Sequence, residues 1–160
     1  DEVDLAGAPP DRVWDALVAV YRALEVPADT YVDAEHRIGA GAWRTRRIAG
    51  ERMSQWVRCG SGLMGPNADT HQVTLSVMSV VEPEGDGSTI TTRIDGTARP
   101  LDGTSTQPVR CASRGTLESF IVKAVREIVP DPADASPDPG GGSNRGGAEA
   151  RSTRGEPIRG

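Results

Sequence analysis

The first clear pattern in the chain is a run of apolar residues at helical spacing near its start. These residues share one face of a helical wheel: Val13, Trp14, Leu17, Val20, Tyr21 and Leu24. Pro9-Pro10 followed by Asp11 favours a helix start, because proline and an acidic residue both suit the first turn. Val26-Pro27 ends the pattern, since a residue before proline is driven out of the α region. We therefore predict an amphipathic helix here.

Two later runs alternate between apolar and polar residues, as half-buried strands do. From Thr70 to Val81, one face holds His71, Val73, Leu75, Val77, Ser79 and Val81. After a turn at residues 82–87, one face of the second run holds Ile90, Thr92, Ile94, Gly96 and Ala98. Two such runs across a short turn predict a long antiparallel hairpin with one polar face.

The segments before this hairpin are shorter and less regular. Residues 30–33 and 37–40 predict a strand and its return, and residues 42–48 continue the sheet after glycines that suggest a bulge. Residues 53–59 fit either a short helix or a strand, and we favour the helix. Residues 60–67 are typical of a loop.

A second amphipathic helix is predicted after a polar connector at residues 99–108. Ser113 is its expected cap, and Val129-Pro130 ends it. Its apolar face is predicted to consist of Leu117, Phe120, Ile121, Ala124, Val125 and Ile128.

The arrangement of these elements predicts the fold class. Packing both helices on the apolar face of the sheet buries all three apolar surfaces at once. We therefore predict a two-layer α+β fold with an N-terminal helix, an antiparallel sheet containing a long hairpin, a C-terminal helix and an extended tail without regular structure. The predicted divisions are an extended lead-in at residues 1–8, a globular domain at 9–130 and a tail at 131–160.

The tail differs in composition from the rest of the chain. The 160 residues include 19 glycines and 12 prolines, and 11 of these lie in residues 131–160. Such a segment cannot bury enough apolar surface to fold alone, so it becomes ordered by lying on a partner. We predict that its arginines are the anchor points: Arg145, Arg151, Arg154 and Arg159. The alternative is that the tail carries no information on function.

Charge and cysteine content narrow the class of protein. The formal net charge of −5 disfavours a globally basic nucleic-acid binder, and no apolar run is long enough to span a membrane. The first residue is Asp1 rather than Met; if a signal peptide or lipoprotein leader was removed from the chain, the expected compartment is extracytoplasmic. Cys59 and Cys111 are compatible with one disulfide; the alternative is two buried free thiols in a cytosolic protein.

One segment combines arginines with tryptophans. Trp43 and Trp56 are interleaved with Arg44, Arg46, Arg47, Arg52 and Arg58. Arginine and tryptophan are enriched at interface hot spots, which predicts a protein contact. The same residues would also suit single-stranded nucleic acid or anionic lipid headgroups. The remaining alternative is a solvated face with both tryptophans in the core.

The sequence contains no recognisable catalytic constellation. A nucleophile pair would need Cys59 with His36 or His71, and Cys59 already has the disulfide as a competing explanation. Asp69 and His71 share one face of a strand if they lie in one, but two ligands do not make a metal site. We therefore predict no catalytic, cofactor or metal site, and no enzyme.

Three stretches carry a resemblance that spans roughly residues 9–129: PPDRVWDALVAVYRALEVP, CGSGLMGPNADTHQVTLSV and PVRCASRGTLE. They are similar to extracytoplasmic and lipoprotein-like proteins of high-GC bacteria that have no known activity. The order of helix, sheet and helix also resembles helix-grip domains of bacterial envelope lipoproteins, by fold analogy alone. The resemblance implies a periplasmic location, peripheral to or lipid-anchored at the inner membrane.

These observations predict a structural subunit on the periplasmic face of a membrane protein assembly, tying neighbouring subunits together with its tail. The chain looks most like the extra periplasmic subunit of a bacterial photosynthetic reaction centre–light-harvesting complex. The predicted contacts are Trp43, the five arginines between residues 44 and 58, and the tail arginines. The alternative is a helix-grip module that binds a small apolar ligand in a cavity lined by Val73, Leu75, Ile94 and Phe120.

Overall fold

The computed structural model describes residues 2–5, 8–101 and 107–129, with the backbone alone described for residues 2–5. The predicted tail at residues 131–160, including its four arginines, lies outside the described residues. The same holds for residues 102–106 of the predicted connector at 99–108.

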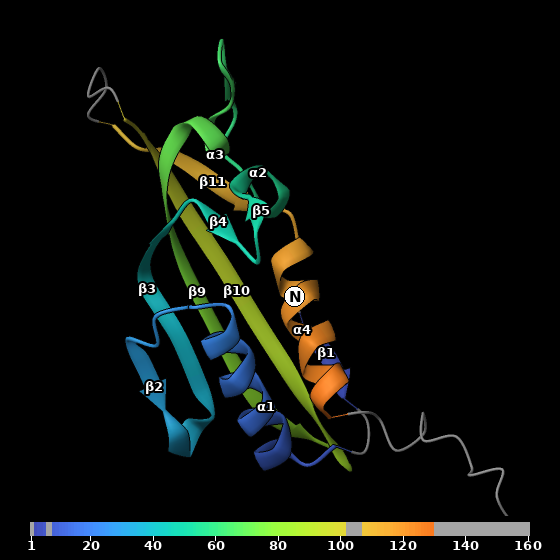
Figure 1. Ribbon diagram of the computed structural model, residues 1–160. Helices are drawn as coiled ribbons and strands as arrows, with labels where there is room; N and C mark the ends of the chain where they lie inside the picture. Colours follow the sequence, from blue (N-terminus) through green and yellow to red (C-terminus); the bar gives the residue numbers. More distant parts are fainter. Residues whose placement is uncertain (1, 6–7, 102–106, 130–160) are drawn as a thin grey trace, which may run out of the picture.

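The described chain forms two layers, a large antiparallel sheet and a pair of helices. Figure 1 shows the helices α1 (Pro10–Ala23) and α4 (Thr116–Ile128) side by side on one face of the sheet. The sheet has seven strands in the order β2-β3-β9-β10-β11-β6, with β1 also paired to β10. This confirms the predicted α+β class with an N-terminal helix, an antiparallel sheet and a C-terminal helix.

The strands of the main sheet differ greatly in length. They are β1 (Glu2–Leu5), β2 (Thr30–Val32), β3 (Arg37–Thr45), β6 (Val57–Arg58), β9 (His71–Glu84), β10 (Gly87–Pro100) and β11 (Val109–Ser113). Residues 2–5 therefore form a paired strand rather than a mere lead-in. The sequence analysis also missed β11, because a five-residue strand has too few positions to show an alternation.

The hairpin of β9 and β10 is the centre of the fold. Each strand has 14 residues, so the pairing extends into both ends of the predicted turn and leaves only Gly85 and Asp86 between the strands. The predicted inward face of β9 is confirmed, because alternate side chains are buried against the helices: Val73, Leu75, Val77, Ser79 and Val81. Only His71, at the start of the strand, remains half-buried.

The predicted bulge lies in β3. Its pairing with β9 shifts register between Ala40 and Trp43, so the strand carries one extra residue there. Gly39 has no room for a side chain, since a Cβ atom would lie 2.4 Å from the backbone oxygen of Val77. The N–H of Gly41 donates to both carboxylate oxygens of Asp29 at 3.0 Å. This contact satisfies an edge N–H that β2 does not reach.

The C-terminal helix begins later and is rotated relative to the prediction. Ser113 is the last residue of β11, and Gly115 precedes the helix with a φ of 77°, a conformation that favours glycine. Ser113 was therefore the wrong cap. Phe120 and Ile128 are exposed to 36% and 51%, while Glu118 and Val122 are buried. The rotation places Phe120 beside Trp56 at the edge of the core, with ring centroids 5.7 Å apart.

Smaller elements connect the strands. They are the 3-10 turn η1 (Asp33–Glu35), the hairpin of β4 (Arg47–Ile48) and β5 (Glu51–Arg52), the helix α2 (Met53–Trp56), the hairpin of β7 (Ser61–Gly62) and β8 (Gly65–Pro66), and the helix α3 (Asn67–Thr70). The ambiguous segment 53–59 thus contains a short helix, as we favoured, followed by the edge strand β6.

Candidate functional site

A disulfide joins Cys59, just after β6, to Cys111 in β11. Both cysteines are buried, so the disulfide is part of the hydrophobic core. It confirms the predicted pairing over the alternative of two free thiols. Cys59 consequently has no thiol to act as a nucleophile with His36 or His71.

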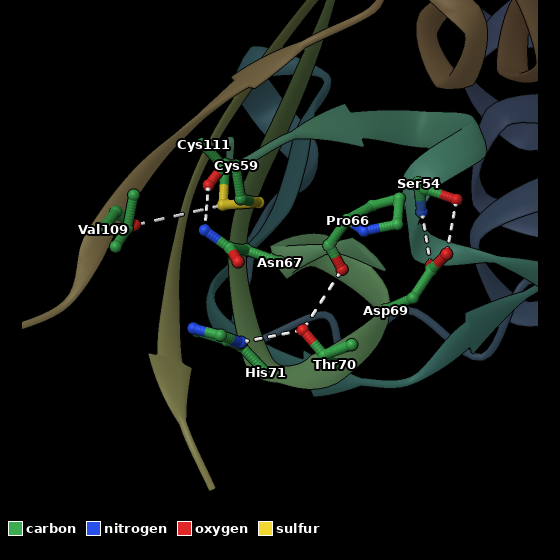
Figure 2. The surroundings of a disulfide bond; sticks show 9 residues. All are labelled: Ser54, Cys59, Pro66, Asn67, Asp69, Thr70, His71, Val109 and Cys111. Carbon is green, nitrogen blue, oxygen red and sulfur yellow. Dashed lines mark hydrogen bonds between the residues drawn. A yellow bond between two sulfur atoms is a disulfide. The ribbon is translucent and has the colours of Figure 1, made fainter. Parts of the chain in front are cut away.

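The surroundings of the disulfide fix the base of the β7–β8 hairpin (Figure 2). Asn67 makes two hydrogen bonds to the chain that leads into this hairpin. Its side-chain Nδ2 donates to the Cys59 carbonyl, and its backbone N–H donates to the Gly60 carbonyl, both at 3.0 Å. The Asp69 carboxylate accepts two hydrogen bonds from Ser54, at 2.9 Å from its N–H and at 2.7 Å from its hydroxyl. These contacts join α2 and α3 to the base of the hairpin.

Asp69 and His71 do not form a metal site. Asp69 lies in α3 rather than in a strand, and its carboxylate faces Ser54. His71 has its Nδ1 3.0 Å from the Thr70 hydroxyl. Among the described residues, no group of three or more His, Cys, Asp or Glu side chains is arranged to hold a metal ion.

The face of the sheet opposite the helices carries polar side chains in two adjacent rows. Strand register places Arg44, Thr74, Thr97 and Arg110 in one row, and Ser76, Asp95, Ala112 and Arg58 in the next. A groove of about 630 Å³ runs over these rows between β9, β10, β11 and β6. We call this surface the open face.

Two arginines of the open face are unpaired within the described residues. Neither Arg58 nor Arg110 forms an ion pair or a side-chain hydrogen bond within the described part of the chain. Both side chains are exposed, and both line the groove together with Asp95 and half-buried hydroxyl residues. The open face therefore presents unpaired guanidinium groups on both sides of a polar floor.

The predicted arginine and tryptophan segment is divided by the fold. Trp43 and Trp56 are each only 6% exposed and belong to the core, as the alternative interpretation held. Trp43 therefore does not present its ring to a partner. Arg44, its neighbour along β3, points to the open face because side chains alternate along a strand.

The other arginines of this segment lie elsewhere. Arg46, Arg47 and Arg52 lie on or beside the separate β4–β5 hairpin, where Arg47 donates to the Gly50 carbonyl at 2.8 Å. Arg58 joins Arg44 on the open face. Sequence reasoning missed Arg110 and Asp95 as members of this site, since only the pairing of β11 with β10 and β6 brings them to it.

The four residues predicted to line a site for an apolar ligand are divided between the core and the surface. Val73 and Leu75 are completely buried and Ile94 is 8% exposed, all within the packed core. Phe120 lies on the outside of α4 against Trp56. The described residues therefore provide no common cavity lined by these four side chains.

A scan against protein-family models finds no family that matches this chain, and a search of curated proteins also finds no match. No helix in the described residues has the length and apolar character needed to cross a membrane.

Proposed function

We propose that this protein is a non-enzymatic accessory subunit of an extracytoplasmic membrane protein assembly and docks on a partner protein through its open face. The observation that carries the proposal is the pair of rows with unpaired arginines and a hydroxyl-rich centre. Among the described residues, no helix covers this face and several of its guanidinium groups are unpaired, which suits association rather than packing within the chain.

The chemistry of the open face favours one kind of partner. Arg44, Arg58 and Arg110 are set around Thr74 and Thr97, and a guanidinium group binds a carboxylate through two parallel hydrogen bonds. The hydroxyl groups between them can bond to main-chain groups. Asp95 disfavours a small anion at the centre, because like charges repel, and instead suits a donor from a polypeptide. The expected partner is a protein surface with carboxylates around a polar centre.

The disulfide and the resemblance support the proposed compartment. A structural disulfide is typical of proteins in oxidising compartments, which supports an extracytoplasmic location. The resemblance favours the periplasmic face of the inner membrane and, among assemblies there, a photosynthetic reaction centre–light-harvesting complex. The tail arginines at 145, 151, 154 and 159 remain predicted contacts with neighbouring subunits.

The test is co-purification of the tagged full chain with its assembly from native membranes. The double variant Arg58→Glu/Arg110→Glu should reduce recovery of the partner at least about tenfold, because the loss of a hot-spot arginine costs about 2 kcal/mol or more. Arg12→Glu/Arg22→Glu on the exposed side of α1 is the matched control and should leave recovery unchanged. Equal recovery with the open-face variant would show that this surface does not dock.

Two further experiments test the role of the tail and the identity of the assembly separately. Deleting residues 131–160 should leave the circular dichroism of the domain intact and weaken co-purification. Unchanged co-purification would show that the tail has no tying role. Mass spectrometry of the recovered proteins identifies the assembly, and the absence of reaction-centre polypeptides would contradict the photosynthetic assignment without affecting the docking face.

A further inference from the structure

We infer that the β7–β8 hairpin inserts its tip into the surface of an anionic phospholipid bilayer and thereby fixes the protein end-on to the membrane. The inference concerns side chains other than those at the centre of the open face, and a class of partner other than a protein. It therefore holds or fails independently of the docking proposed above.

The tip of the hairpin consists of two exposed apolar side chains. Leu63 and Met64 have exposed fractions of 108% and 88%, the highest of the large apolar residues in the described chain. They lie between Gly62 and Gly65, and Figure 1 shows the hairpin projecting beyond the rest of this end of the molecule. Side chains of this kind are normally buried against something, so their full exposure at a projecting tip indicates a contact surface.

The apolar surface continues onto the main sheet. Leu101, which follows β10, is 57% exposed, and it lines a shallow pocket together with Leu63 and Met64. Val109 at the start of β11 adds a further 39%-exposed apolar side chain at the same end. Half of the exposed large apolar residues of the described chain are thus gathered at one end.

The hairpin is held so that its tip stays outward. The disulfide and the two hydrogen bonds of Asn67 anchor the hairpin base (Figure 2). The Ser54–Asp69 pair joins the neighbouring helices α2 and α3. A preorganised loop loses little conformational freedom on binding, so most of the free energy from inserting its tip is available for association.

Charge is distributed unequally between the two ends of the molecule. β9 begins and β10 ends beside the β7–β8 hairpin, and Arg99 lies at this end of β10. The opposite end holds the turn between β9 and β10, which carries Glu82, Glu84 and Asp86. A pocket at that same end is lined by Asp11, Glu35 and Glu82, and also by His36 and Arg37, which pair with Asp11 and Glu35 at 3.3 Å. Despite the net charge of −5, an anionic surface therefore attracts the hairpin end and repels the other.

The tip fits a bilayer better than a protein pocket. Protein hot spots are enriched in tryptophan, tyrosine and arginine and depleted in leucine, whereas this apex has only aliphatic and thioether side chains. Arg99 lies on the sheet, behind the tip, which matches a bilayer in which the phosphate layer lies above the hydrocarbon. Stable peripheral binding generally needs two signals, and an apolar tip with Arg99 behind it supplies both.

The experiment is sedimentation of the full chain with vesicles of phosphatidylcholine alone or mixed with phosphatidylglycerol. Leu63→Gln/Met64→Gln should lower the partition coefficient on mixed vesicles at least about tenfold, because both side chains leave the hydrocarbon boundary. The control Ile128→Gln makes the same kind of change at an exposed apolar residue of α4 and should bind like the wild type. All variants keep the tail arginines, so their contribution cancels.

Charge-reversal variants on β10 test the electrostatic contribution to membrane binding. Arg99→Glu should lower binding to the anionic vesicles about tenfold in low salt and less in high salt. Arg93→Glu, six residues earlier on the same strand and the same face, is the matched control and should have a much smaller effect. Far-ultraviolet circular dichroism of each variant verifies that the fold is retained.

Depth is tested with Leu63→Trp. Its fluorescence should shift to the blue and be quenched by lipids brominated near the headgroup, against the background of three tryptophans that are buried in the protein. The inference is wrong if the wild type binds neither kind of vesicle, or if the tip variant binds as well as the wild type. It is also wrong if the tip variant loses only a protein partner in detergent, which would make the hairpin a protein contact.

Discussion

Tyr21 illustrates how single polar residues tie the two layers of this molecule together. Its hydroxyl donates to Ser79 Oγ at 2.8 Å, and Ser79 Oγ lies 2.8 Å from Thr92 Oγ1. The three hydroxyl groups come from α1, β9 and β10, and all three residues are buried. Buried polar groups are tolerated when they are hydrogen-bonded, and here the chain of hydroxyls fixes the helix over the central hairpin.

This tyrosine predicts a loss of stability at alkaline pH. Burial raises the pKa of Tyr21 to about 12 from its usual 10.0, while the hydrogen bond to Ser79 acts in the opposite direction. Because the pKa is raised in the folded state, the stabilisation is complete below pH 10 and is lost as pH rises towards 12. The expected loss of unfolding free energy over this range is about 2–3 kcal/mol, measured by urea denaturation at successive pH values.

Tyr21→Phe is the control for this effect. It should lower stability at neutral pH by only about 1 kcal/mol, because Ser79 keeps Thr92 as a partner. The variant should also show a smaller decline of unfolding free energy between pH 10 and 12. An equal decline in both proteins would show that the alkaline loss originates elsewhere.

At the scale of elements, the sequence predicts what is long and periodic. α1, β9 and β10 are long enough to show the spacing of their apolar residues, so their buried faces were correctly predicted. β6 has two residues, and its pairing with β11 connects segments about fifty residues apart along the chain. The local sequence of either segment does not predict this pairing, because it depends on tertiary contacts.

The same limit applies to the open face. Neighbouring arginines in the sequence looked like one patch, but alternation along β3 sends Trp43 to the core and Arg44 outward. Arg46, Arg47 and Arg52 leave the main sheet with the β4–β5 hairpin. The residue that completes the site, Arg110, comes from β11, which the sequence analysis missed.

The close approach of β3 and β9 gives a prediction at this scale. Gly39→Ala should lower the unfolding free energy by about 1–3 kcal/mol, since its Cβ would meet the backbone oxygen of Val77, which cannot move without disturbing β9. Gly41→Ala, two residues along the same strand, is the control, because its nearest neighbour would be Asp29 Oδ2 at 3.8 Å. Thermal unfolding of both variants measures the difference, and equal melting temperatures would contradict the packing argument.

At the scale of the whole molecule, the disulfide joins two segments that are distant in the sequence, at the end of the domain that carries the β7–β8 hairpin. Cys59 and Cys111 are 52 residues apart, and the intervening chain includes the hairpin tip, α3, β9 and β10. The bond attaches the chain after β6, the shortest strand of the main sheet, to β11. Without the disulfide, the two residue pairs between β6 and β11 would have to hold β6 at the edge of the sheet. The disulfide thus contributes to the global stability and to the position of the tip.

Removing this bond should destabilise the entire domain. Cys59→Ala/Cys111→Ala should lower the unfolding free energy by about 4 kcal/mol, because the unfolded chain regains the freedom of a loop of this length. That is a large fraction of the roughly 5–15 kcal/mol typical of a folded domain. The wild type with a reductant should approach the melting temperature of the double variant, and the variant itself should not respond to the reductant. If reduction leaves the melting temperature of the wild type unchanged, the packing of β11 against β10 is sufficient to hold this end together.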